Sequence, residues 1–266
     1  MKTKNILIAS FALLLLALIS RFLLVNTAYA PKPVAKKAAG PKWDEAYIAS
    51  LHFADESLPV TDNYVLNKVK RVFNTYGYDN LRSYRLHRVA STWFPIMEPI
   101  LADYGIPNDF KYVPLVESGL HSGVSHKGAA GVWQFMPHTA RQYGLKVNGG
   151  VDERLQIKKS TIAACKYIRS LHKEFKNWTL VAAAFNIGEN KLKRLIRQQE
   201  QDDYFSIRFN PETSIYVYKL IAVKEIIEHP NLHGYDKAPI PSYAINLPDT
   251  RFYTNNLLRG IIHTSP

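Results

Sequence analysis

The sequence has almost no cysteine, and this excludes two classes of site. Cys165 is the only cysteine among 266 residues, so neither an intramolecular disulfide nor a cysteine-rich metal site can form. It lies among small apolar residues, where a buried core position is the expected role. The histidines are scattered and no H-E-x-x-H motif occurs, so a zinc hydrolase is not indicated. We expect no metal and no cofactor.

Acidic residues are absent from the first thirty positions, and this segment has the order of a secretory signal. Two lysines precede a long apolar stretch, which ends in an A-x-A cleavage pattern at residues 28–30. Pro31 follows directly and should hinder a signal peptidase. The apolar run over residues 6–25 is nearly long enough to span a bilayer. We therefore expect export, with cleavage and retention as a membrane anchor both left open.

Negative charge is scarce in the chain as a whole. The formal net charge is +12 and the pI is about 9.6, which favours polyanionic partners without choosing among them. Nucleic acid, anionic lipid and an acidic wall polymer all fit this balance. A basic segment, ENKLKRLIRQQ, covers residues 189–199. Such a segment is usually a solvated helix face, and an export signal argues against nucleic acid, so we expect no nucleic-acid partner.

Internal repeats and long strand-like alternation are also missing, whereas helical periodicity is strong. Apolar residues recur at helical spacing over residues 62–76 and 156–176. The segment NWTLVAAAFNIG is almost wholly apolar and predicts a central, buried helix ending at Gly188. A short helix is predicted in FPIMEPILADYGIP, and a further helix should start at Pro211 with Asn210 as its cap. The predicted fold class is all-α.

The expected domain organisation follows from composition. Residues 1–30 are a signal peptide or signal anchor, and residues 31–42, rich in proline, alanine and lysine, are a linker. One catalytic domain is expected over residues 43–236. The helical signal fades beyond it, so residues 237–266 are expected to form a peripheral tail.

The stretch KYVPLVESGLHSG ends an apolar run on a single carboxylate, Glu117. Asn108 can cap a helix that Gly119 would end, which places Glu117 in the last turn. The helix dipole and apolar neighbours would both raise the pKa of this acid and suit it to general acid catalysis. From its position alone, an exposed glutamate without a role is the better explanation.

A glycine-containing loop follows, with aromatic residues directly after it. Gly128 and Gly131 permit close approach of backbone to a ligand, and Trp133, Gln134 and Phe135 come next. An amide beside aromatic rings suits a sugar, which has polar edges and apolar faces. A packed loop over core aromatics fits the same residues.

Four ordered motifs carry a resemblance to a known family. They are Glu117-Ser118, GAAGVWQFMP, AFNIG at 184–188 and PETSIYVYK at 211–219. In this order and spacing they resemble the Slt-type lytic transglycosylases, and most closely the membrane-bound transglycosylase D branch. The resemblance covers roughly residues 60–230, with a motif core at 108–230, and implies a lysozyme-like helical fold.

The resemblance also implies roles for individual residues. Glu117 matches the catalytic acid and base of the family. The matches to residues that contact the sugar or line the cleft are Ser118, Ser125, Gln134, Met136, Phe185, Asn186 and Tyr216. Phe185 departs from the usual tyrosine of the family: the ring is kept and a hydroxyl is lost.

The implied substrate is the glycan strand of peptidoglycan, and the implied reaction uses one carboxylate. Glu117 would protonate the oxygen between MurNAc and GlcNAc, then accept the proton of the muramyl C6 hydroxyl as it attacks C1, which gives a 1,6-anhydro end. Two other readings stay open: a goose-type hydrolase and a non-catalytic peptidoglycan-binding protein. Asp152 and Glu153 are the nearest candidates for a hydrolase base, although a solvated helix start is their expected role.

Overall fold

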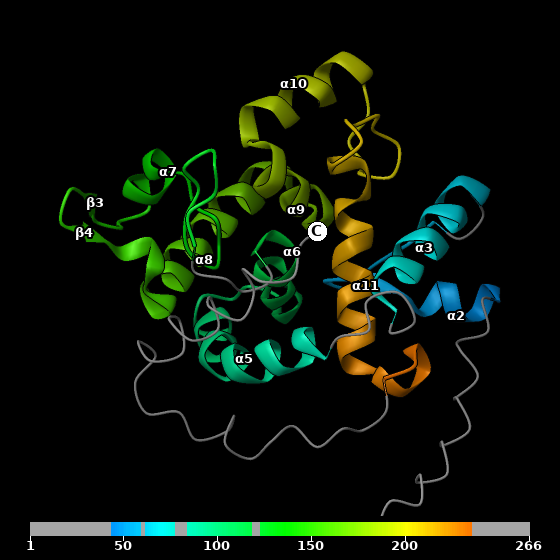
Figure 1. The fold of residues 1–266 in the computed structure, drawn as a ribbon. Coiled ribbons are helices and arrows are strands. Elements are labelled where there is room, and N and C mark those ends of the chain that lie inside the picture. The colour runs from blue at the N-terminus through cyan, green and yellow to red at the C-terminus, as the bar shows by residue number, and fades with distance from the viewer. Residues whose placement is uncertain (1–43, 60–61, 78–83, 119–122, 236–266) are drawn as a thin grey trace, which may run out of the picture. The chain divides into compact units, whose positions relative to one another are not determined.

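A computed structural model of the protein describes residues 44–59, 62–77, 84–118 and 123–235. Several predictions therefore concern residues outside the described ranges: the signal segment 1–30, the linker 31–42, the helix end at Gly119 and the tail 237–266. Helices dominate the described part (Figure 1). The α-helices are α2 (Glu45–Ser50), α3 (Asn63–Tyr76), α5 (Arg85–Asp103), α6 (Val113–Ser118), α7 (Pro137–Gln142), α8 (Ile157–Phe175), α9 (Trp178–Ile187), α10 (Glu189–Gln199) and α11 (Tyr216–Glu228).

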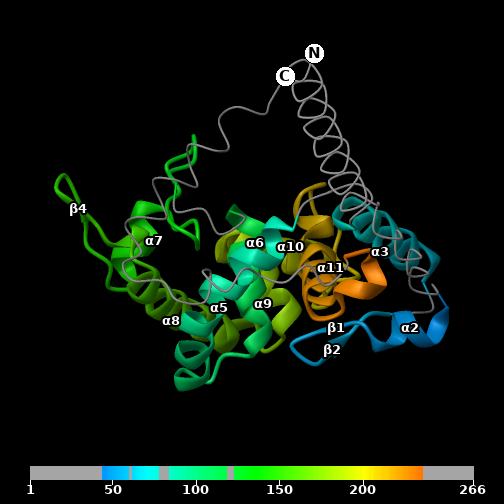
Figure 2. The ribbon, with the colours of Figure 1, turned by 60° about the horizontal axis from the view of Figure 1, so that its bottom comes forward.

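Short 3₁₀ helices and two small hairpins complete the described part. The 3₁₀ helices are η1 (Asn108–Tyr112), η2 (Glu153–Leu155), η3 (Thr213–Ile215) and η4 (Pro230–His233). Strands β1 (His52–Phe53) and β2 (Glu56–Ser57) pair antiparallel, as do β3 (Val147–Asn148) and β4 (Val151–Asp152). Figure 2 shows the β1–β2 hairpin beside α2 and the β3–β4 hairpin beyond α7. The all-α prediction is confirmed.

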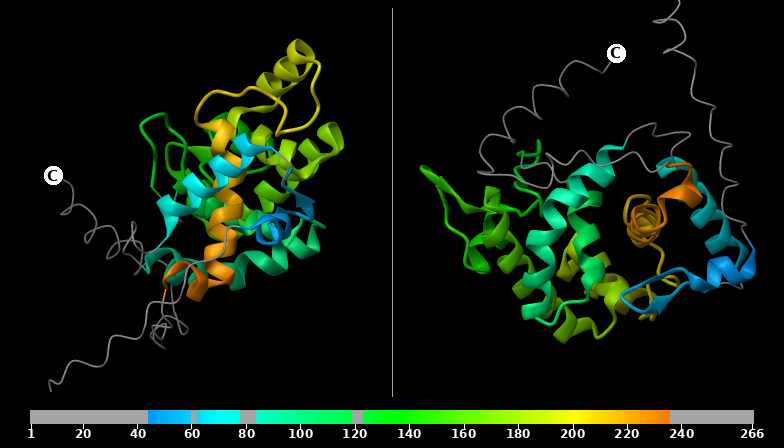
Figure 3. Two further views of the ribbon diagram at one scale, coloured as in Figure 1. Left: turned by 90° about the vertical axis from the view of Figure 1, so that its right-hand side faces the viewer. Right: turned by 90° about the horizontal axis from the view of Figure 1, so that it is seen from below.

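Helix α11 lies at the centre of this arrangement. Viewed down its axis in Figure 3, it is surrounded by other elements, and it contacts α3, α5, α6, α9 and the β1 strand. Nine of its residues are buried, which fits its nearly continuous apolar sequence. Helix α9 is buried as predicted and ends at Gly188, whose φ is +88°. Cys165 is fully buried, as predicted.

Two helix predictions need correction. Helix α5 is 19 residues long, although the sequence predicted only a short helix within it. Its two internal prolines, Pro95 and Pro99, are both exposed, and the helix continues through them. The α-helix predicted to start at Pro211 starts later, at Tyr216, because the 3₁₀ helix η3 precedes α11. Asn210 does cap the segment as predicted, since its side chain accepts from the Thr213 amide at 2.9 Å.

Residues before α5 are tied to the helices that follow. Glu56 on β2 accepts hydrogen bonds from the amides of Trp178 and Thr179, which otherwise have no partner at the start of α9. The buried Lys224 ammonium of α11 donates to Asp109 on η1 at 2.7 Å. Asp109 also accepts from the Ala54 amide. These contacts hold the β1–β2 hairpin against the helices that carry the candidate site.

No helix within the described ranges combines the length and hydropathy that crossing a bilayer requires. In the same ranges, no group of three or more histidine, cysteine or acidic side chains is placed to hold a metal ion.

Candidate active site

Glu117 lies in the last turn of α6, where the sequence predicts it. The 3₁₀ helix η1 runs directly into α6, so the segment is short and irregular, with Pro114 tolerated in the first turn. Val113 and Leu115 are buried, while Glu117 itself is half-buried. The apolar end of α6 thus delivers one carboxylate to a position between helices.

Two donors reach the Glu117 carboxylate from other helices. The Tyr216 hydroxyl, at the start of α11, donates to Oε1 at 2.6 Å. The Asn186 side-chain amide, near the end of α9, also acts on this carboxyl group and lowers its pKa. The sequence placed all three residues in one site by resemblance, and the structure brings them together.

Burial is the main influence on the acidity of Glu117. It raises the pKa of Glu117 above the usual range of a glutamate, while the Tyr216 hydroxyl and the Asn186 amide lower it without cancelling the rise. The exposed Glu212 raises this pKa further, and Lys219 lowers it. Burial and the Glu117 charge also raise the pKa of Tyr216 well above its usual value, so its hydroxyl stays protonated. The predicted rise in the pKa of Glu117 is therefore confirmed, with burial as its cause.

A folded loop at residues 123–136 lies beside α6. Ser118 connects the two, because its hydroxyl contacts the carbonyls of Pro114 and Val132 at 3.0 and 2.9 Å. Its hydroxyl is thus engaged with backbone. This contact favours a role in holding the loop on α6, whereas the sequence predicted contact with substrate.

The other loop residues of the prediction have different surroundings. The Ser125 hydroxyl accepts from the Ala129 amide at 3.0 Å, and its own hydrogen has no acceptor among the described residues, so it remains free to donate to a ligand. Gln134 has a positive φ of 49°, and the nitrogen of its side-chain amide donates to the Gly131 carbonyl at 2.8 Å. Met136 is 46% exposed and precedes α7.

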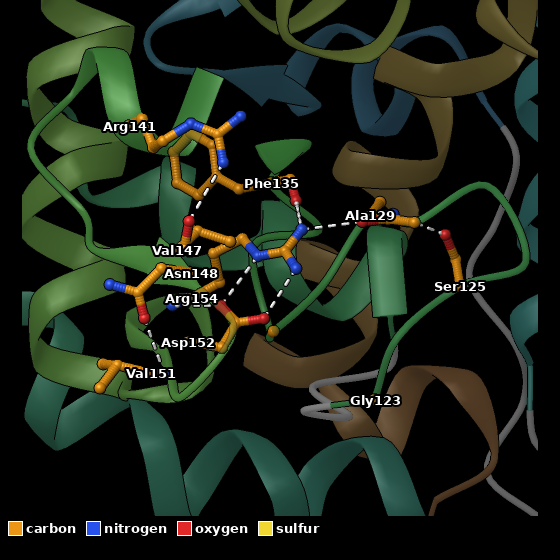
Figure 4. A network of polar contacts seen from close by, with 12 residues as sticks. Gly123, Ser125, Ala129, Phe135, Arg141, Val147, Asn148, Val151, Asp152 and Arg154 are labelled. Carbon is orange, nitrogen blue, oxygen red and sulfur yellow. Dashed lines mark hydrogen bonds and ion pairs between the residues drawn. The ribbon is translucent and has the colours of Figure 1, made fainter. Parts of the chain in front are cut away.

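Arg154 holds this loop from below, a role that the sequence did not predict. Figure 4 shows its guanidinium between the Asp152 carboxylate and the loop. One nitrogen donates to the carbonyls of Gly128 and Phe135 at 2.8 and 2.9 Å, and the rest of the group pairs with Asp152. Arg154 is only 6% exposed. Hydrogen bonds of this kind, from a buried charged group, fix the loop strongly.

The carboxylates of Asp152 and Glu153 are paired with basic side chains, Arg154 and Lys159. Arg154 lowers the pKa of Asp152, and Lys159 lowers the pKa of Glu153. Asp152 does cap η2, as a helix start should, but Glu153 is buried, so the prediction that both are solvated is wrong for Glu153. Carboxylates committed to cations in this way are poor candidates for a catalytic base.

Phe185 forms the floor under the loop. Its half-buried ring packs against the rings of Trp133, Phe135 and Tyr167 with centroid distances of 5.5–6.1 Å. Trp133 is fully buried, and its indole nitrogen donates to Thr161 at 3.0 Å. The ring of Phe185 therefore packs in an aromatic cluster, and the substrate contact predicted for it stays a prediction.

Comparison with known proteins agrees with this geometry. Residues 96–216 match the family model for the transglycosylase SLT domain. The match includes Glu117, the loop and Tyr216. Over 135 residues the chain is 33% identical to the membrane-bound lytic murein transglycosylase D of Escherichia coli strain K12. Within these residues the chain is similar to the Slt-type transglycosylases.

The matched regions are partial. The alignment with transglycosylase D covers 48% of this chain and 30% of that protein. Two solved structures show a weaker likeness, at 19% identity each. The soluble lytic transglycosylase SLT70 of Escherichia coli gives a TM-score of 0.47 over 63% of this chain and 31% of that one. An inactive mutant of Slt from Pseudomonas aeruginosa gives 0.43 over 77% and 35%.

Proposed function

We propose that this protein is a peptidoglycan lytic transglycosylase that cleaves the β-1,4 bond between MurNAc and GlcNAc and leaves 1,6-anhydro-MurNAc ends. The observation that carries the proposal is Glu117, a half-buried acid of raised pKa that receives a hydrogen bond from Tyr216 and lies within the residues that match the SLT domain. The test is clearance of purified sacculi by the purified protein. Sacculi that stay intact at every pH examined would refute the proposal.

The two proton transfers use one carboxyl group. Protonated Glu117 donates its proton to the glycosidic oxygen as the bond from that oxygen to C1 breaks, and the GlcNAc end leaves as an alcohol. The resulting carboxylate then accepts the proton of the muramyl C6 hydroxyl, whose oxygen forms a bond to C1 of the same ring. Glu117 ends protonated, no water is consumed and no metal takes part.

The donors around Glu117 suit this exchange. Tyr216 donates to Oε1, which leaves Oε2 as the oxygen that carries the transferable proton. When the carboxylate forms, the bond from Tyr216 strengthens, because a hydrogen bond to an ionised acceptor is stronger than one to a neutral acceptor. Burial favours the acid, whereas Tyr216 and Asn186 favour the carboxylate.

A hydrolase on the same fold needs a second carboxylate to activate water. Glu212 is the carboxylate that favours this second candidate, because it is exposed and its charge acts on Glu117. The Glu212 side chain makes no hydrogen bond or ion pair with another described residue, and the Glu212 carbonyl accepts from the Ile215 amide. The tethered C6 hydroxyl has a large advantage in effective concentration over a bound water, and we therefore prefer the transglycosylase.

We predict that Tyr216→Phe slows cleavage by roughly ten- to hundred-fold without changing the product. The ring still fills its buried place, while one hydrogen bond to the carboxylate, of about 1.5–3 kcal/mol, is lost. Initial rates on sacculi and mass spectra of the released muropeptides measure both effects. A variant that releases a different product would show that the hydroxyl takes part in the chemistry directly.

Export completes the proposal. Residues 1–30 would carry the protein across the cytoplasmic membrane to the cell envelope, where the glycan strands lie, and residues 6–25 would hold any uncleaved fraction in the membrane. Cell fractionation with intact-mass analysis tests this. Full-length protein found wholly in the cytoplasm would contradict it.

A further inference from the structure

Thr213 lies behind the candidate site and takes no direct part in the proton transfers of Glu117. Its side chain is fully buried, and its hydroxyl donates to Oδ1 of Asn186 at 2.8 Å. The Asn186 amide in turn acts on the Glu117 carboxyl group and lowers its pKa, as a donor NH₂ group does. Thr213 is therefore one residue removed from the carboxyl group that the proposed reaction uses.

The contact determines which end of the amide faces Glu117. A side-chain amide has an acceptor oxygen and a donor NH₂ group of nearly the same shape. Because the Thr213 hydroxyl occupies Oδ1, the NH₂ group is turned toward the carboxyl group. The flipped amide would instead present its oxygen to the Glu117 carboxylate, and two acceptors would face each other in a half-buried site.

We propose that Thr213 is a positioning residue, whose hydroxyl fixes the amide of Asn186 so that its NH₂ group meets Glu117. This inference rests on the proposed function for its consequence in catalysis. Its geometric part, the direction of the Asn186 amide, holds for the protein whether or not it cleaves peptidoglycan.

The backbone of Thr213 is itself held on both sides. Its amide donates to the Asn210 side chain at 2.9 Å, and its carbonyl accepts from the Tyr204 hydroxyl at 2.7 Å. The same Tyr204 hydroxyl accepts from the Val217 amide at 3.2 Å. Tyr204 is 2% exposed. Thr213 is thus fixed to the start of α11, so the two donors to Glu117 are positioned by one connected structure.

The groups that act on the charge of Glu117 come from three segments. Tyr216 and Lys219 lie on α11, Asn186 lies on α9, and Glu212 precedes η3. A substitution at Thr213 leaves all of these side chains in the protein. A change in the titration of Glu117 then reports the orientation of Asn186.

The experiment compares Thr213→Val with Thr213→Ser. Side-chain ¹³C-labelled glutamate is incorporated, and the Glu117 carboxyl signal is identified by its absence in the Glu117→Gln spectrum. We expect the pKa of Glu117 to rise in Thr213→Val, because the flipped amide no longer stabilises the carboxylate, and to match the wild type in Thr213→Ser. On sacculi, kcat/KM of the valine variant should fall by about ten-fold, with its basic limb moved to higher pH.

The control is made in a variant that lacks the side-chain amide of Asn186. In Asn186→Ala, adding Thr213→Val should cause no further change in the Glu117 titration, because the two residues act through one contact. If the valine variant fails to fold, Thr213→Ala removes the same hydroxyl without placing a methyl group against the amide. Titration curves of the wild type and the hydroxyl-free variant that coincide would overturn the proposal. A shifted titration in a protein without lytic activity would keep it and refute the proposed function alone.

Discussion

Glu117→Gln is expected to abolish the lysis of purified peptidoglycan while leaving the fold intact. Glutamine can accept the hydrogen bond from Tyr216 but can neither donate nor accept the transferred proton. Loss of a general acid or base typically lowers the rate roughly 10²–10⁴-fold, and in this mechanism one group serves both steps. Turbidity clearance of sacculi measures the loss. A variant that clears sacculi at nearly the wild-type rate would remove Glu117 from the mechanism.

The same variant should show a characteristic dependence of stability on pH. The folded-state pKa of Glu117 is raised, so the protonated form is favoured in the native protein and ionisation destabilises it. The contribution of this group to stability is fully present below the pKa of the unfolded chain and is lost as pH rises through the folded pKa. Glutamine avoids that loss.

Urea unfolding of both proteins at several pH values measures this difference. The free energy of unfolding of Glu117→Gln relative to the wild type should increase as pH rises from the usual range of glutamate through the folded pKa, and then level off. A constant difference across this window would show that Glu117 titrates at its usual value.

Gly131→Ala is expected to destabilise the protein by about 3 kcal/mol or more, the largest stability effect that we predict for one added methyl group. Gly131 has a φ of +76°, and a Cβ atom there would lie 1.9 Å from the carbonyl oxygen of Arg154. Arg154 cannot easily move away, because its side chain is buried and bonded to the loop on one side and to Asp152 on the other.

Gly128→Ala is the matched control. Gly128 has a φ of +84°, but nothing lies within 4 Å of the position of an added Cβ. It should therefore suffer only the backbone strain of the left-handed region, about 1–2 kcal/mol. Urea unfolding of both variants separates strain from collision. Equal losses in the two variants would mean that the loop at residues 123–136 can move away from Arg154.

Local sequence patterns were sufficient for much of the fold. The apolar segment before Gly188 predicted the buried helix α9, and periodic apolar residues predicted α3 and α8. The length of α5 was missed because proline usually ends a helix. Here both prolines are exposed, and which face of α5 is exposed is set by its packing against α8, η1 and α11.

In the candidate site too, local features were predictable from the sequence, whereas contacts between distant segments were not. The position of Glu117 at the end of an apolar helix is a local feature, and the sequence predicted it. Its partner Tyr216 is 99 positions away, so only the resemblance to a family placed the two together. Thr213 and Arg154 had no local signal, because a threonine near a cap and an arginine near an aspartate are common on protein surfaces. Their roles arise from contacts with the backbone and side chains of distant segments.

The chemical identity of the cleavage product tests the proposed mechanism most directly. Purified sacculi are digested in ¹⁸O-labelled water, and the released muropeptides are analysed by mass spectrometry, with Glu212→Gln in parallel as the control for a second carboxylate. We predict 1,6-anhydro-MurNAc ends, one water lighter than the hydrolysis product and free of ¹⁸O, for both proteins. Reducing MurNAc ends that carry ¹⁸O at C1 as the main product, lost in Glu212→Gln, would contradict the transglycosylase and identify a hydrolase.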